Sequence, residues 1–193
     1  MIRESLEEMN FNKQLVFAYL TCERFFPNCV YFSGNFSFGN PNILREAIDL
    51  VYNSIFQEAS FDKQNIEQYL QIIYQNIPNT NDFSTFYATI AMYSGGIIYE
   101  SVNLLKKTEI EKKLTDIVTM STDAIDCFIQ VRDDMDFEDE SFEEKILNHP
   151  LMQTERFLQN GIISYLNKID TITLSDVNTL LQLQEKSAIT LKI

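Results

Sequence analysis

The residues best suited to chemistry in this 193-residue chain are an adjacent acid and base, Glu23 and Arg24. They follow an apolar run at 15–20, and Pro27 and Asn28 come soon after and predict the end of a helix. The run is apolar on every side, so we expect this helix to lie inside the fold. Charges beside a buried helix must be paired or functional, because burying a lone charge costs several kcal/mol.

Neighbours on a helix lie about 100° apart, so Glu23 and Arg24 cannot face each other. Glu23 therefore needs a partner from another helix, and an arginine fork suits a buried carboxylate. Arg45 and Arg156 are the candidates. The pair is interpreted as an interhelical contact that fixes helix register, with a ligand or partner site as the alternative. Asn28 is expected to cap a short helix at 29–32, the alternative being that its amide contacts a ligand.

Carboxylates are the only abundant groups with catalytic potential. All-helical nucleotide pyrophosphatases hold magnesium on acids spaced one helical turn apart, and this spacing occurs here three times. However, solvated helices show the same spacing often, so we expect no metal site. The pairs are Asp123-x-x-Asp126, Asp133-x-x-Asp136 and Glu140-x-x-Glu143.

Histidine and cysteine are too few for the usual sites. The single histidine, His149, precedes Pro150 and is expected to cap a helix, and alone it cannot form Glu-x-x-His di-iron or Cys/His zinc sites. The three cysteines, Cys22, Cys29 and Cys127, lack ligand spacing, are expected to be small buried groups, and indicate a location inside the cell. Without a nucleophile elbow or a phosphate-binding loop, the sequence predicts no catalytic residue and no cofactor.

Charge restricts the partners. The formal net charge is −13, and residues 123–144 hold ten acids against one base, Arg132. Such a segment repels phosphate backbones and anionic membranes, so nucleic-acid and membrane binding are not expected. The N-terminus lacks the pattern of a signal peptide, and the longest uncharged stretch, 83–99, is short for a membrane span. A soluble cytoplasmic protein is predicted.

Helix patterns dominate the chain, and Gly and Pro are scarce. We predict an all-α, single-domain, compact bundle of seven or eight helices over 1–193. Asn40-Pro41 marks one helix start, whereas 108–111 and 141–144 have the form of capping boxes. An acidic link is expected at about 133–140 and a strand-like tail at 188–193. Expected helices cover 3–9, 12–26, 41–59, 62–76, 82–107, 108–132, 150–169 and 173–185.

The chain resembles the uncharacterised bacterial family typified by YjaG, a domain of unknown function. The resemblance extends over most of the chain and is strongest at 20–28, in a Cys-Glu-Arg-x-x-Pro-Asn signature. It implies a compact helical fold and no assigned activity. Further matching positions are Phe38-Gly39, Arg45, Asp49-Leu50, Ile77-Pro78, Asp82-Phe83, Ala91, Glu100, Pro150, Glu155 and Gln159.

Three positions depart from the pattern that we expect of this family. Tyr52 replaces a tryptophan, Cys29 replaces a tyrosine, and Tyr93 stands where relatives tend to carry an aspartate. If that acid belonged to a catalytic set, this chain lacks it, which argues against a carboxylate enzyme.

Two classes of function therefore remain open. The first is a non-enzymatic protein that binds another protein, with a homodimer or an immunity protein for a basic toxin as variants. The second is a small-ligand binder or carboxylate enzyme with a pocket around a cluster of charged and polar residues. The first is favoured. The cluster comprises Glu23, Arg24, Asn28, Arg45, Asp49 and Glu100.

Overall fold

A computed structural model describes residues 2–57 and 63–186, and within these ranges it contains helices and no strand. The all-α prediction is confirmed, with nine α-helices and two short 3-10 helices among the described residues. The predicted tail at 188–193 lies outside the described residues. The helices are α1 (Ile2–Glu7), α2 (Phe11–Phe36), α3 (Pro41–Phe56), α4 (Lys63–Tyr74), η1 (Thr80–Asp82), α5 (Phe86–Asn103), η2 (Leu104–Lys106), α6 (Ile110–Arg132), α7 (Phe142–Asn148), α8 (Pro150–Lys168) and α9 (Leu174–Lys186).

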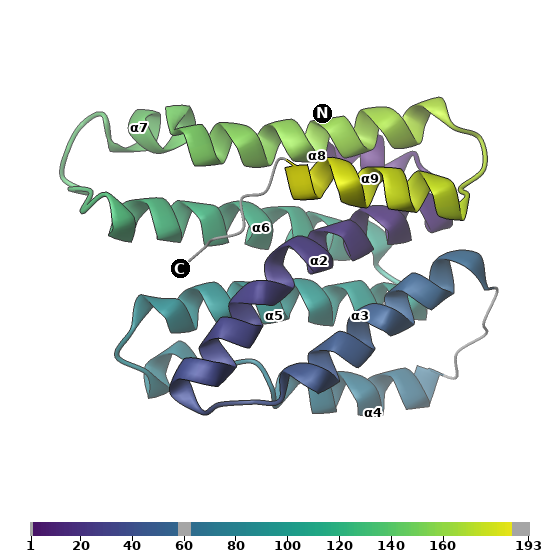
Figure 1. The fold of residues 1–193 in the computed structure, drawn as a ribbon, viewed down its shortest axis with the longest axis horizontal. Coiled ribbons are helices and arrows are strands. Elements are labelled where there is room, and N and C mark those ends of the chain that lie inside the picture. Colours follow the sequence, from purple (N-terminus) through teal and green to yellow (C-terminus); the bar gives the residue numbers. More distant parts are fainter. Residues whose placement is uncertain (1, 58–62, 187–193) are drawn as a thin grey trace.

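Helix α5 lies at the centre of the packing and contacts α2, α3, α4 and α6 (Figure 1). Its small residues allow this close approach. A Cβ at Gly95 would lie 2.7 Å from Cγ1 of Ile77, and one at Gly96 would lie 2.5 Å from Sδ of Met120. Both distances are too short for a side chain, so these glycines allow Ile77 and α6 to pack against α5.

Helix α2 crosses the molecule diagonally and joins the α3–α5 side to the α8–α9 side (Figure 1). The predicted stop at Pro27 is wrong, because the helix continues to Phe36 with Pro27 inside it. A proline within a helix costs about 3 kcal/mol. Pro27 itself is exposed, whereas Asn28, Cys29 and Phe32 beyond it are buried. Burial of this last part of the helix offsets the cost of the proline.

The helix ends confirm some of the expected caps and correct others. Asn40 accepts a hydrogen bond from the backbone N–H of Asn42 before Pro41, and His149 Nδ1 accepts one from Leu151, as expected. Neither capping box forms: Glu109 has φ +48° and makes no side-chain cap, and Ser141 makes none either. Around Thr108, the ammonium of Lys113 donates to the carbonyl oxygens of Asn103 and Thr108 instead.

The apolar side chains form one large core cluster and one smaller aromatic cluster. The smaller cluster surrounds the buried ring of Phe32, which stacks on Phe36 at a centroid distance of 4.7 Å and meets Phe83 edge-on at 5.0 Å. It holds the link between α2 and α3 against the start of α5. None of the helices in the described part of the chain is long and apolar enough to cross a membrane.

Candidate functional site

Glu23 forms a two-pronged ion pair with Arg45 across the α2–α3 contact. Nη1 and Nη2 of Arg45 donate to the two carboxylate oxygens of Glu23 at 2.9 and 2.7 Å, and Nε donates to Asp49 at 3.0 Å. The guanidinium also lies 5.3 Å from the ring centroid of Phe26. Arg45 was one of the two expected partners of Glu23; Arg156, the other, is exposed on α8.

This group is partly open to solvent, with the Arg45 and Glu23 side chains 32% and 21% exposed. Hydrogen bonding to Glu23 raises the pKa of Arg45 above its ordinary value. Burial, together with the negative charge of Glu23, raises the pKa of the neighbouring Tyr19 phenol. Both groups therefore keep their neutral-pH protonation states, which suits an ion pair that joins two helices.

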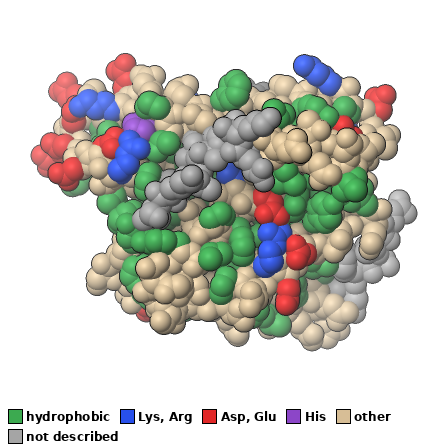
Figure 2. All heavy atoms as spheres, viewed as in Figure 1, with side chains coloured by type: hydrophobic (Ala, Val, Ile, Leu, Met, Phe, Trp, Pro, Cys, Tyr) green, Lys and Arg blue, Asp and Glu red, His purple; other side chains and the backbone are tan. Residues whose placement is uncertain are grey.

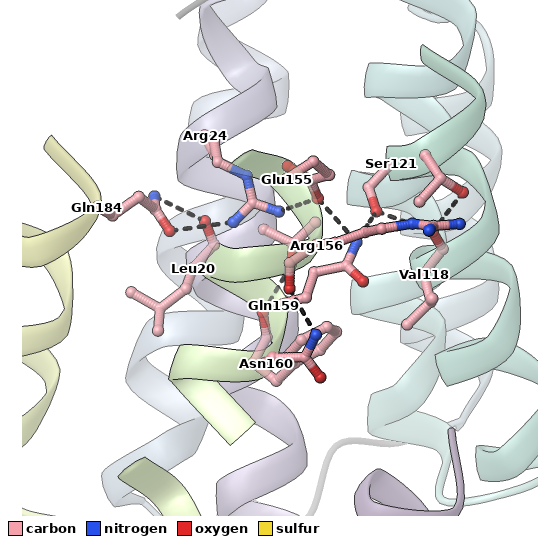
Figure 3. Close-up of polar contacts among 12 residues, drawn as sticks. Leu20, Arg24, Val118, Ser121, Glu155, Arg156, Gln159, Asn160 and Gln184 are labelled. Atoms are coloured by element: carbon pink, nitrogen blue, oxygen red, sulfur yellow. Dashed lines mark hydrogen bonds and ion pairs between the residues drawn. The ribbon is translucent and has the colours of Figure 1, made fainter. Parts of the chain in front are cut away.

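Arg24 points away from the α3 contact, about 100° around α2 from Glu23, and pairs with Glu155 of α8 (Figure 3). Nη2 of Arg24 lies 2.7 Å from Oε1 of Glu155, and the two side chains are 4% and 0% exposed. Gln159 donates to the same carboxylate oxygen at 2.8 Å and to Ser121 of α6 at 2.9 Å. This network is fully buried and joins α2, α8 and α6.

Helix α9 completes the network around Arg24 through Gln184. Its side-chain oxygen accepts from Nη1 of Arg24 at 3.3 Å, and its side-chain nitrogen donates to the carbonyl oxygen of Leu20 at 2.9 Å (Figure 3). Two buried atoms of this network, Nε of Arg24 and Oε2 of Glu155, have no hydrogen-bond partner among the residues that the structure describes. The network thus connects residues up to 164 positions apart in the chain.

Sequence reasoning missed the partners of Arg24. A signal for them exists on α8, whose buried face consists of Met152, Leu158, Ile162, Ile163 and Leu166 with two polar exceptions. Those exceptions are Glu155 and Gln159, one helical turn apart and inside an apolar stripe. Both also belong to the positions that carry the family resemblance. A buried carboxylate on one helix needs a cation, and Arg24 is the buried arginine that meets it.

Asn28 lies in the core between α2 and α5 and does not cap a helix. Its amide donates to the hydroxyl of Ser94 at 3.1 Å, and Asn28 is 5% exposed. Nearby, the thiol of Cys22 lies 3.2 Å from the hydroxyl of Ser101. Burial raises the pKa of Cys22 and that of Cys29 to about 12, so both thiols stay protonated and unreactive at neutral pH.

Glu100 lies apart from the other predicted residues, on the side of α5 that faces α4 and α6. It lines a pocket of about 460 Å³ with Tyr74, Tyr99 and Asp116 among others. Burial raises the pKa of Glu100, and the side chain of Asn103 donates to it at 2.9 Å. The six predicted residues therefore occupy separate places: Glu23, Arg45 and Asp49 lie together, whereas Arg24, Asn28 and Glu100 each contact other partners.

The acidic link forms a turn between α6 and α7, and we call this turn together with the first residues of α7, residues 133–144, the acidic turn. Its acids gather at the α7 end of the molecule around the histidine (Figure 2). Arg132 pairs with Asp133 at 2.7 Å, His149 lies 3.2 Å from Asp133, and Lys145 pairs with Asp139. The remaining acids of the turn form no ion pair with any residue that the structure describes. They are Asp134, Asp136, Glu138, Glu140, Glu143 and Glu144.

The acidic turn also exposes apolar side chains. Phe137 at its centre is 81% exposed, and Val131 and Leu147 on the flanking helices are 45% and 40% exposed. The described residues contain no group of three or more His, Cys, Asp or Glu side chains placed to hold a metal ion. The turn is therefore a negatively charged surface with an aromatic side chain at its centre.

Comparison with known proteins agrees with the resemblance carried by residues 20–28. The model of the family described as "Protein of unknown function (DUF416)" matches residues 1–191. The chain belongs to the DUF416 family. A crystal structure of a DUF416 family protein from Shewanella baltica OS155 is similar, with a TM-score of 0.83 and 24% identity over 96% of this chain and 93% of that one. That likeness confirms the fold. None of the curated proteins matches the sequence.

Proposed function

We propose that this DUF416 protein acts by binding another protein, without catalysis, and that the acidic turn is its contact surface. The observation that carries the proposal is the exposed ring of Phe137 among acids that have no ion-pair partner in the described chain. A large exposed aromatic side chain within a charged surface is typical of a binding anchor. The charge of the turn fits a partner with a basic surface, such as a basic toxin.

The environment of the reactive groups supports a role without catalysis. Cys22 and Cys29 are buried, with raised thiol pKa values, and Arg24 is committed to Glu155 and Gln184. Glu23 is held by Arg45. The three cysteines are free, which fits our proposal of a cytoplasmic location.

The negative charge of the acidic turn also restricts the kind of protein that can bind to it. Two acidic turns facing each other would repel, so a homodimer is not expected to use this surface. A basic partner would be attracted over about a Debye length, which speeds association and makes the affinity sensitive to salt. Salt dependence is therefore the property that separates this surface from an apolar one.

Affinity capture followed by direct binding measurement tests the proposal. Partners captured by the wild type are purified, and their affinity is measured by calorimetry for the wild type and for the triple variant Asp134→Asn/Phe137→Ser/Glu138→Gln. We expect the variant to bind at least about tenfold more weakly, because it loses an aromatic anchor and two charges. The wild-type affinity should also fall between about 50 and 200 mM NaCl.

The matched control removes the same types of side chain elsewhere. Glu7, Glu8 and Phe157 are exposed, Phe157 at 72%, and Glu7→Gln/Glu8→Gln/Phe157→Ser should bind like the wild type. Equal binding by wild type and acidic-turn variant, or an affinity that ignores salt, would refute the proposal. Sedimentation of the chain alone checks the alternative of a homodimer.

A further inference from the structure

A pocket large enough to hold a small molecule lies beside Glu100. It lies between α5 and α6 at the end of α4 and has a volume of about 460 Å³. Gly96 and Met120 both line it, and Sδ of Met120 packs directly against Gly96, where a Cβ would lie only 2.5 Å away. Met92 and Ile77 add apolar surface. A concave, mostly apolar site of this size with a few polar groups is typical of small-ligand binding.

Two carboxylates stand in the wall of this pocket. Glu100 accepts a hydrogen bond from Asn103, and burial and the nearby Asp116 raise its pKa. Asp116 on α6 is partly buried and makes no hydrogen bond or ion pair with any residue that the structure describes. The pocket therefore holds negative charge that lacks an ion-pair partner within the described chain.

Three tyrosine rings complete the wall. The rings of Tyr74 and Tyr99 meet edge to face with centroids 6.4 Å apart, and Tyr93 lies farther along α5. Tyrosine phenols are neutral at pH 7, and burial raises the pKa of Tyr93 and Tyr99 further. The face of a neutral aromatic ring attracts cations, and this attraction strengthens where water is excluded.

The neighbouring charges leave a negative balance. Lys113 lies near Glu100, but its ammonium is held by the carbonyl oxygens of Asn103 and Thr108, and Lys112 is exposed. At the other end, Arg3 donates to the hydroxyl of Thr119, which lines the pocket. Further along α6, negative charge is added beside Tyr93 by Asp123 and Asp126.

We propose that this pocket binds a small organic ammonium ion with an apolar body, its charge beside Glu100 and Asp116 and its body among Tyr74, Tyr93, Tyr99 and the methionines. An anion would be repelled by the two carboxylates. A neutral apolar molecule would leave Asp116 unpaired in the wall. The site is separate from the acidic turn, so it goes beyond the protein-binding function proposed above and is tested independently of it.

Methyl NMR of the wild-type protein tests this directly. The chain has six methionines, of which Met92 and Met120 line the pocket while Met9, Met135 and Met152 lie elsewhere. The probe is benzyltrimethylammonium, compared with neutral 2-phenylethanol. We expect saturable shifts of the Met92 and Met120 methyl signals, with at least about tenfold tighter binding of the cation. The signals of Met120 and Met92 are assigned by Met120→Leu and Met92→Leu.

The matched variants remove one negative charge each from α6. Asp116→Asn should weaken binding of the cation about fivefold or more and leave binding of 2-phenylethanol unchanged. Glu111→Gln, at an exposed position of the same helix, should change neither. The signals of Met9 and Met152 report whether each variant keeps its fold. The proposal is overturned if cation and alcohol bind alike, if both variants weaken the cation equally, or if about 10 mM benzyltrimethylammonium shifts neither pocket methyl.

Discussion

Glu23 and Arg24 are adjacent on α2, yet their ion pairs lie in different environments. Glu23 meets Arg45 near solvent, with 21% and 32% of the two side chains exposed, and Asp49 beside them is 59% exposed. Arg24 meets Glu155 with 4% and 0% exposed, inside a network of amide and hydroxyl groups. Water can replace a lost partner in the first pair and not in the second.

Burial decides what each of these two ion pairs contributes to stability. An exposed pair gains little because water screens it. A buried pair also adds little net stability, since its charges were removed from water, but either charge becomes very costly once its partner is gone. The Arg24 network is therefore expected to determine how α2, α8 and α9 pack, while the Glu23 pair adjusts the α2–α3 contact.

The largest effect is expected for Arg24→Met. It leaves the carboxylate of Glu155 buried without a cation, and the free energy of unfolding should fall by about 3–5 kcal/mol. Urea denaturation measures this. In the double variant Arg24→Met/Glu155→Met no charge remains buried, so most of the loss should be recovered. A double variant as unstable as the single one would show that the pair contributes more through its hydrogen bonds than through charge.

A smaller effect is expected for Glu23→Gln. Because the pair with Arg45 is partly exposed but two-pronged, the loss should be about 1 kcal/mol. A double-mutant cycle with Arg45→Met isolates the interaction energy, and raising NaCl from about 0.1 to 1 M should reduce it. The corresponding cycle for Arg24 and Glu155 should change little with salt. Equal salt sensitivity of the two cycles would contradict the difference in burial.

The sequence predicted the elements better than their contacts. Apolar periodicity located most of the helices, and Asn40-Pro41 and His149-Pro150 marked two helix starts, because these signals are local. The partner of Glu23 was also among the two candidates. The boundary at Pro27 failed because burial of distant surfaces, which local sequence does not show, outweighs the cost of a proline.

The candidate site was harder to predict because its residues come from distant parts of the chain. Arg24 and Glu155 are 131 positions apart, and Gln184 is 160 positions from Arg24. One sequence supplies no information about such pairs beyond the need for a counter-charge. The sequence groups Glu100 with Glu23 because both are acids at positions that match the family. In the structure, the side chain of Glu100 lies on the side of α5 that faces Asp116 and the tyrosines.

Glu100 differs from Glu23 and Glu155 because it forms no ion pair with a described residue. Its half-buried carboxylate accepts a hydrogen bond from the side-chain amide of Asn103. Burial raises its pKa above 4.5 in the folded protein, so the folded state binds this proton more tightly than the unfolded chain. Below about pH 4.5 the carboxyl is protonated in both states and costs nothing. As pH rises through the raised pKa, the folded state becomes less stable than it would be without this acid.

Glu100→Gln removes that cost. Its effect on the free energy of unfolding should be smaller than those of Arg24→Met and Glu23→Gln, and it should stabilise the protein where they destabilise it. We expect the variant to be more stable than the wild type at pH 7, by up to about 0.5 kcal/mol, and the gain to vanish below about pH 4.5. Urea denaturation at several pH values measures it, with exposed Glu111→Gln as the control that shows no such gain. A variant that is less stable than the wild type at pH 7 would mean that the folded state stabilises the ionised carboxylate of Glu100. Glu100 would then resemble Glu23, whose carboxylate is stabilised by Arg45.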